Sequence, residues 1–233
     1  MTRWNGKKKA VTFSFDDGVT QDIRLIEILN RYGLKGTFNL NSALLGLNGC
    51  LNRNGVDVRH DKVQPSQVKD VYRGHEVAVH TLSHPRLTEL SEEAIIYQVD
   101  EDRKALERLV GYPVVGMAYP CGGVNNDERV AAVIGANTPI RYSRTITSSK
   151  DFTPQTQNLL RFNPTTYYID DDFEETVDKF LSSDADGEQL LYIWGHAYEM
   201  DAGYITWEKF EEICKRLSGR SDIFYGTNKE VLL

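Results

Sequence analysis

Short apolar runs alternate with longer amphipathic stretches along the whole chain. The short runs are rich in β-branched and aromatic residues, and most of them end in Gly, Pro, Asp or His, which is typical of buried strands. We predict seven strands, at Ala10–Phe15, Gly36–Leu40, Glu76–Val79, Val114–Tyr119, Ile140–Thr145, Leu190–Trp194 and Ile223–Tyr225.

Between these runs, apolar residues recur at the spacing of one helix face. The pattern predicts helices over Asp22–Tyr32, Asp172–Leu181 and Trp207–Leu217, and Ser91 begins a capping box in front of a longer one. Strands that alternate with helices favour a parallel sheet with crossover helices, either closed as a barrel or open and doubly wound. Residues 1–233 contain no internal repeat and no Pro/Ser-rich linker, so we expect one domain.

Composition narrows the class of protein. The chain has 233 residues, of which 40% are hydrophobic and 26% charged, which is ordinary for a globular protein. Its net charge of −7 argues against nucleic acid as a partner. No apolar run approaches the roughly 20 residues that a membrane span needs. Three widely spaced cysteines predict reduced thiols, so we expect a cytoplasmic protein, or a cell-envelope or secreted one if a signal sequence has been removed.

The first candidate for chemistry is a pair of carboxylates. Asp16 and Asp17, followed by Gly18, end the first predicted strand, at the edge where α/β folds place their sites. Adjacent acids repel each other and raise one pKa unless a metal ion or a cation compensates their charge. The alternative is an N-cap for the following helix, but capping needs only one of the two.

The second candidate is a histidine pair, His80 and His84, directly after the third predicted strand. In a helical turn, residues four apart project to one face, at about the spacing that two imidazoles need around one cation. Together with one carboxylate they would make a three-ligand metal site with open positions. His196 follows another predicted strand, and histidine suits a general acid because its pKa is near neutral.

These segments resemble the polysaccharide deacetylases, the NodB-homology proteins of carbohydrate esterase family 4. Residues 13–18 (FSFDDG) are similar to the family's TFDDG motif, and residues 74–84 (GHEVAVHTLSH) to its GHEIxxHTxxH motif. Residues 117–122 (MAYPCG) resemble the third motif, which lines the acetyl pocket, and residues 191–196 (LYIWGH) occupy the place of the last. The four motifs fall in family order, so the resemblance covers most of the chain.

The resemblance implies a fold, a reaction and a set of roles. We expect an α/β fold, a distorted (β/α) barrel of about seven parallel strands. Asp17, His80 and His84 would hold one divalent metal ion, with zinc expected first and cobalt or another divalent ion as alternatives. Asp16 would be the base and His196 the catalytic acid. The expected partner is an N-acetylated sugar, oligosaccharide or polysaccharide, with O-acetylated carbohydrate second, and the sequence does not predict an oligomeric state.

The third motif departs from the family pattern. The family's arginine, which pairs with the catalytic Asp, is replaced by Ala118, so Asp16 needs another cation. Arg144, at the end of the next predicted strand, is the candidate, and a surface arginine in a turn is the alternative. Cys121 stands where an aromatic residue is common, and we expect a packed thiol there.

Three residues are predicted to form the substrate or oxyanion wall: Tyr119, Cys121 and Trp194. Aromatic residues at strand ends are equally common in cores. Glu199 is expected either to bond His196 or to serve only its loop. The polar, aperiodic segment 48–63 is predicted to be a surface excursion, with its His60 in solvent.

The sequence therefore predicts a metal-dependent hydrolase that removes acetyl groups from carbohydrate. One alternative is an amidohydrolase of the same superfamily that acts on a small non-sugar amide. Another is a non-catalytic carbohydrate-binding relative, which the intact ligand and catalytic positions disfavour. An iron oxygenase would share the two-histidine, one-carboxylate ligand set, but such enzymes usually have a jelly roll, which the alternating pattern does not predict.

Overall fold

The computed structural model describes residues 3–184 and 186–233. Its main sheet has the strand order β7-β6-β5-β2-β1-β9-β8, and β10 also pairs with β1. These strands are β1 (Lys9–Asp16), β2 (Gly36–Leu40), β5 (Glu76–Val79), β6 (Gly116–Ala118), β7 (Tyr142–Arg144), β8 (Thr166–Tyr167), β9 (Gln189–Gly195) and β10 (Ile223–Tyr225). Every pairing in this sheet is parallel. The predicted α/β fold, a distorted barrel of parallel strands, is confirmed.

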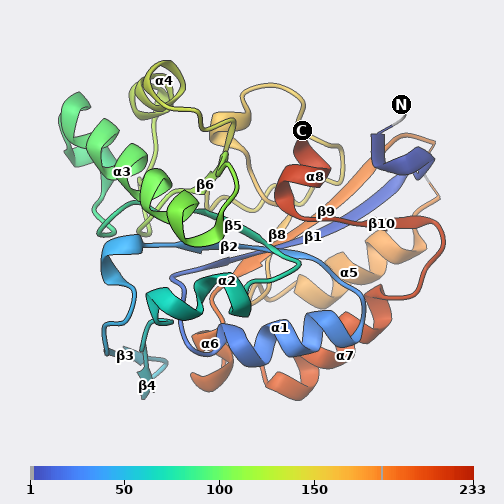
Figure 1. Ribbon diagram of the computed structural model, residues 1–233. Coiled ribbons are helices and arrows are strands. Elements are labelled where there is room, and N and C mark those ends of the chain that lie inside the picture. The colour runs from blue at the N-terminus through green and yellow to red at the C-terminus, as the bar shows by residue number, and fades with distance from the viewer. Residues whose placement is uncertain (1–2, 185) are drawn as a thin grey trace.

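Most of the helices lie on the outside of this barrel, and the last one packs Val231 and Leu232 against inward-facing residues of the strands. The helices are α1 (Asp22–Arg31), α2 (Val68–Val71), α3 (Glu92–Val110), α4 (Glu128–Asn137), α5 (Phe173–Ser182), α6 (Tyr198–Asp201), α7 (Trp207–Leu217) and α8 (Asn228–Leu232). Figure 1 shows α1, α5 and α7 packed together on one side of the strands, and α3 beside α4 on another. Ser91 is the N-cap of α3, because its side chain accepts a hydrogen bond from the Ala94 N–H. The predicted capping box is not completed, because Ala94 has no side-chain acceptor to return the bond.

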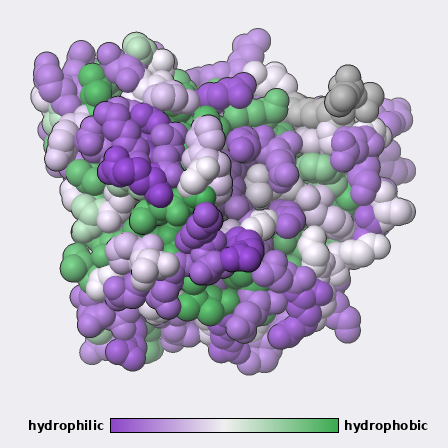
Figure 2. Space-filling view, in the orientation of Figure 1, coloured by the Kyte–Doolittle hydropathy of each residue, from purple (hydrophilic) through white to green (hydrophobic). Residues whose placement is uncertain are grey.

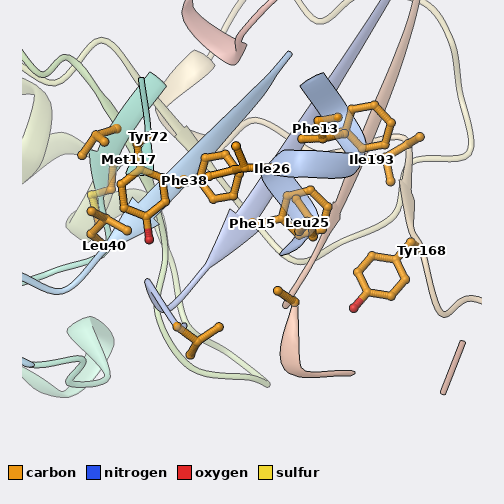
Figure 3. Packing of buried hydrophobic residues seen from close by; sticks show 14 of the residues in the cluster. Phe13, Phe15, Leu25, Ile26, Phe38, Leu40, Tyr72, Met117, Tyr168 and Ile193 are labelled. Carbon is orange, nitrogen blue, oxygen red and sulfur yellow. The ribbon is translucent and has the colours of Figure 1, made fainter. Parts of the chain in front are cut away.

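The central strand β1 is buried on both of its faces. Because successive residues of a strand point to opposite faces, Phe13 and Phe15 lie on one face. There they pack with Phe38 of β2 and with Leu25 and other core residues of α1 (Figure 3). The alternate positions, which include Ser14 and Asp16, point the other way, into the barrel. The core thus fixes the direction in which the last residue of β1 projects.

Segment 48–63 is a surface excursion as predicted, since most of its residues are exposed, but it has regular structure that the sequence analysis did not predict. It forms an antiparallel hairpin of β3 (Cys50–Arg53) and β4 (Val56–Arg59). The turn is Asn54-Gly55, and both residues have a positive φ, of 53° and 74°, as a two-residue hairpin turn of type I′ requires. The hairpin lies at one margin of the molecule, where β4 contacts α6 (Figure 1).

The surface of the molecule and its cysteines can be compared with the sequence analysis. Within the described residues, no helix is both long and apolar enough to cross a bilayer. The face seen in Figure 2 is mostly hydrophilic, with smaller hydrophobic patches between the polar side chains. Cys50, Cys121 and Cys214 are all free thiols.

Candidate functional site

The carboxyl ends of the parallel strands meet around a pocket of about 590 Å³. Of the predicted site residues, eight line it, namely Asp16, Asp17, His80, His84, Tyr119, Cys121, Trp194 and His196, whereas Arg144 does not. Further lining residues come from segment 48–63, namely Leu51, Arg53, His60 and Lys62, and from segments that the sequence did not mark, among them Leu44, Ile146, Tyr167, Ile169 and Tyr204. The sheet thus gathers residues more than 100 positions apart at a single edge.

A potential metal-ligand set lies at the floor of this pocket. Oδ1 of Asp17 is 3.8 Å from Nε2 of His80 and 3.6 Å from Nε2 of His84. One ligand atom from each residue lies within 4.8 Å of the other two. Nδ1 of His80 is 2.9 Å from the Ala118 carbonyl oxygen, to which it donates, so the lone pair is on Nε2 and faces Asp17. Burial lowers the pKa of His80 to about 4, which keeps this imidazole neutral, as a metal ligand must be. The donor set therefore fits a divalent ion.

The histidine pair is not built on a helical turn, so that part of the prediction was wrong. Thr81 and His84 have positive φ values of 69° and 62°, which bend the chain sharply after β5. Asn41 Nδ2 holds this bend by donating to the carbonyl oxygens of His80 and Thr81, at 2.5 and 2.9 Å. The bend still stacks the two rings edge to face, with centroids 4.9 Å apart.

Arg144 lies against Asp16 deep in the barrel. Its guanidinium donates to both carboxylate oxygens, at 2.6 Å to Oδ1, and its side chain is fully buried. Asn39 Nδ2 donates to the same Oδ1 at 2.8 Å. Burial on its own would raise the pKa of Asp16, but the charge of Arg144, with smaller effects from His80 and His196, holds that pKa below its ordinary value. The cation missing at Ala118 is thus supplied from the neighbouring strand β7, and Asp16 stays ionised.

His196 faces Asp16 from the end of β9, with Nε2 4.0 Å from Oδ2. Glu199 binds it twice: the His196 backbone N–H donates to Oε2 at 3.0 Å, and Nδ1 lies 3.0 Å from Oε1. Tyr167 also donates its hydroxyl to Oε1. Burial alone would lower the pKa of His196, but the Glu199 carboxylate raises it to about 9. His196 is therefore protonated at neutral pH, and Glu199 serves the histidine instead of serving only its loop.

Tyr119 and Cys121, two of the three residues predicted to form the substrate or oxyanion wall, differ in what they offer to the pocket. The Tyr119 ring is buried and its hydroxyl donates to Leu160, while its backbone N–H donates to the Arg144 carbonyl oxygen at 3.0 Å. The Tyr119 amide is consequently not free to bind an oxyanion. Pro120 has no N–H, so Cys121 offers the next amide along this loop. The Cys121 thiol lies 3.8 Å from Nδ1 of His84, and burial raises its pKa, as expected for a packed thiol.

Trp194 is engaged by the protein itself. Its ring stacks on Tyr167 with centroids 4.1 Å apart, and the guanidinium carbon of Arg144 lies 4.4 Å from its ring centre. The indole thus supports the Arg144 side chain, and the aromatic side chains nearer the pocket mouth, such as Tyr204, are the more exposed ones.

His60 is not in solvent as predicted. The β3–β4 hairpin brings its Nε2 to within 3.1 Å of Asp17 Oδ2, and it brings Lys62 to the same residue. Because the sequence of segment 48–63 has no periodicity, nothing in it signalled where the two side chains would lie.

Comparison with known proteins identifies the family of this chain. The sequence model of the family described as polysaccharide deacetylase matches residues 4–138. The peptidoglycan-N-acetylglucosamine deacetylase PgdA of Listeria monocytogenes is 28% identical over 130 residues, which are 54% of this chain and 24% of that protein. Chitin deacetylase 2 of Cryptococcus neoformans is 27% identical over 138 residues, 55% of this chain and 30% of that one. The chain spans less than a third of the length of these relatives.

A solved structure shares the fold across nearly the whole chain. The Xyl-CE4 domain of a multidomain xylanase from the hindgut metagenome of Trinervitermes trinervoides superposes with a TM-score of 0.59. The match covers 96% of this chain and 89% of that domain, at 19% identity.

Proposed function

This chain belongs to the polysaccharide deacetylase family, and we propose that it is a metal-dependent hydrolase that removes the acetyl group from an N-acetylated carbohydrate. One observation carries the proposal. A neutral imidazole pair with a carboxylate, an ionised carboxylate and a protonated histidine surround a single pocket. Metal-assisted amide hydrolysis uses these three parts: a metal-ligand set, a base and an acid.

We assign the metal to Asp17, His80 and His84. Imidazole and carboxylate ligands suit zinc, with cobalt as an alternative, and three protein ligands leave open positions for water and substrate. When bound, such an ion lowers the pKa of a water molecule and polarises a carbonyl oxygen.

Proton transfer belongs to Asp16 and His196. Arg144 keeps Asp16 ionised at neutral pH, so Asp16 can accept a proton from the attacking water. Glu199 keeps His196 protonated, so His196 can donate a proton to the leaving amine nitrogen. The two groups face each other across 4.0 Å, which places both beside one reacting centre. The N–H of Cys121 is the assigned donor to the developing oxyanion.

The substrate class is taken from the relatives. PgdA is named for peptidoglycan N-acetylglucosamine and chitin deacetylase 2 for chitin, so we propose an N-acetylated glucosamine unit in the pocket. A small non-sugar amide is the second candidate, because the pocket also has the aliphatic side chains Leu44, Leu51, Ile146 and Ile169 in its wall. Sugar hydroxyls gain little from such a surface.

Acetate release from chitin oligosaccharides, peptidoglycan and small N-acetylated amines tests both candidates. The metal-stripped protein should be inactive, and added zinc or cobalt should restore it. The matched variants are Asp16→Asn and Asp17→Asn. The first should retain its metal while activity falls about 10²–10⁴-fold, as for a lost general base. The second should lose metal, with activity partly restored at high metal concentration. Loss of metal from the Asp16 variant alone would reverse the two roles, and acetate release that chelation leaves unchanged would refute the proposal.

A further inference from the structure

Residues 60–63, which follow the β3–β4 hairpin, run antiparallel to the loop that follows β1. The Thr20 N–H donates to the Asp61 carbonyl oxygen at 2.8 Å, and the Val63 N–H donates to that of Gly18 at 2.9 Å. Between these bonds, Val19 and Lys62 form an isolated β-bridge. The hairpin is therefore tied to the segment that carries Asp17.

Two side chains of residues 60–63, those of His60 and Lys62, contact Asp17 directly. Nε2 of His60 lies 3.1 Å from Oδ2. Lys62 donates through Nζ to the Asp17 backbone oxygen at 2.7 Å, and the same Nζ lies 3.9 Å from Oδ1. The Lys62 side chain is 5% exposed and that of His60 17%. An ionised carboxylate only accepts hydrogen bonds, so the His60 nitrogen must be the donor.

The two carboxylate oxygens of Asp17 have different neighbours. Oδ1 is the oxygen near both His80 and His84, and Oδ2 is the one bound by His60. The carboxylate is thus held in one rotation by groups of the protein itself.

The backbone of Asp17 also needs support. Its φ of 83° lies in the left-handed region, which is strained for a residue other than glycine. Such a conformation persists only when its surroundings hold it. Here the Asp17 N–H donates to the Asn39 carbonyl oxygen at 3.0 Å, and Lys62 takes the Asp17 carbonyl oxygen.

We propose that His60 and Lys62 are positioning residues for the metal ligand Asp17, and that the hairpin is part of the metal centre. His60 fixes Oδ2 so that Oδ1 alone is presented to the ion, and Lys62 fixes the backbone from which the carboxylate projects. This inference rests on the proposed metal site. Hydrogen-bond partners of metal ligands orient them, and their loss typically reduces metal affinity by 10–100-fold.

A pair of amide substitutions tests the geometry. In His60→Gln the side-chain nitrogen falls near the position of Nε2, and in His60→Asn it falls near that of Nδ1, out of reach of Asp17. His60→Ala removes the donor, and Asp57→Asn changes an exposed residue of the same hairpin as a control. Zinc dissociation constants are measured on the metal-free proteins by competition with a chromophoric chelator. The absorption spectrum of bound cobalt reports the ligand field, and circular dichroism shows that each protein is folded.

We expect zinc binding to weaken about 10–100-fold in His60→Ala and His60→Asn. His60→Gln should recover most of that loss and the cobalt spectrum, and Asp57→Asn should match the wild type. Equal affinity in His60→Ala and the wild type, or equal losses in the Gln and Asn variants, would overturn the inference. These results need no substrate. A wild-type protein without zinc affinity would instead refute the proposed metal site, so the two failures are distinct.

Discussion

Replacing Arg144 by methionine tests why Asp16 is ionised. Methionine retains much of the apolar volume but leaves a buried carboxylate without its cation. Removing one partner of a buried ion pair typically costs about 3–5 kcal/mol of stability. Asp16 can limit this loss by taking up a proton. At pH 7 protonation of a carboxyl with an ordinary pKa of 3.8 costs about 4 kcal/mol, since each pH unit contributes roughly 1.36 kcal/mol. The electrostatic loss at pH 7 should therefore be about 3–4 kcal/mol.

The same reasoning gives the pH dependence. In the wild type the folded-state pKa of Asp16 is lowered, so the ion pair stabilises the fold above pH 3.8 and this contribution is lost as the pH falls through the folded-state value. In the Arg144 variant burial dominates and the pKa is raised, so stability falls as the pH rises from 3.8 to that raised value. Protonation of Asp16 limits how much stability the variant can lose, and this limit is lower by roughly 2.7 kcal/mol at pH 5 than at pH 7. The gap between wild type and variant should narrow accordingly.

Urea unfolding at pH 7 and pH 5, with a chelator present so that metal binding does not contribute, measures this gap. The double variant Asp16→Asn/Arg144→Met is the control, because it has neither charge and should lose the extra pH dependence. In the single variant the acidic limb of kcat/KM should move to higher pH with the metal still bound. A loss under about 1 kcal/mol that is equal at the two pH values would refute the electrostatic account of Arg144.

Three further results are expected. His84→Ala should lose tight metal retention and most activity, which metal analysis of the purified protein checks, and stoichiometric metal in the variant would exclude His84 as a ligand. Glu199→Gln removes the carboxylate that raises the pKa of His196 to about 9, so the alkaline limb of the pH–rate profile should move to lower pH. An unchanged alkaline limb would show that His196 is not the group whose deprotonation causes it. Gly195→Ala places a Cβ against the buried Tyr168 ring, so thermal unfolding should show a loss of about 1–3 kcal/mol, and wild-type stability in this variant would contradict the packing argument.

The sequence predicts the sheet well because parallel strands are buried on both faces and appear as continuous apolar runs. Each of the seven predicted runs overlaps a strand of the main sheet. Strand β8, Thr166–Tyr167, was missed because two residues show no period. The hairpin turn at Asn54-Gly55 does have a recognisable signal, but the flanking strands are exposed and lack the alternation that would mark them.

Residues at strand ends were predictable for a similar reason. Asp16, His80 and Arg144 end or follow buried strands, and parallel strands bring their carboxyl ends to one edge. The positions of His60 and Lys62 depend instead on contacts between a hairpin and a loop far away in the sequence. Nor can the sequence reveal left-handed backbone at residues other than glycine, because tertiary contacts hold it there.

The strand order has a consequence for how the molecule can be made. β1 leaves the ribosome before the other strands of the sheet, but it pairs with β9 and β10, which are the last strands of the sheet to be synthesised. Until then one flank of β1 and half of the other offer unpaired amides and carbonyls, so the barrel is expected to close only after β9 and β10 have been synthesised. A fragment that stops at residue 138 would contain the whole region recognised by the family model. Its sheet would nevertheless lack β9 and β10, which pair with β1, and its pocket would lack both Arg144 and His196.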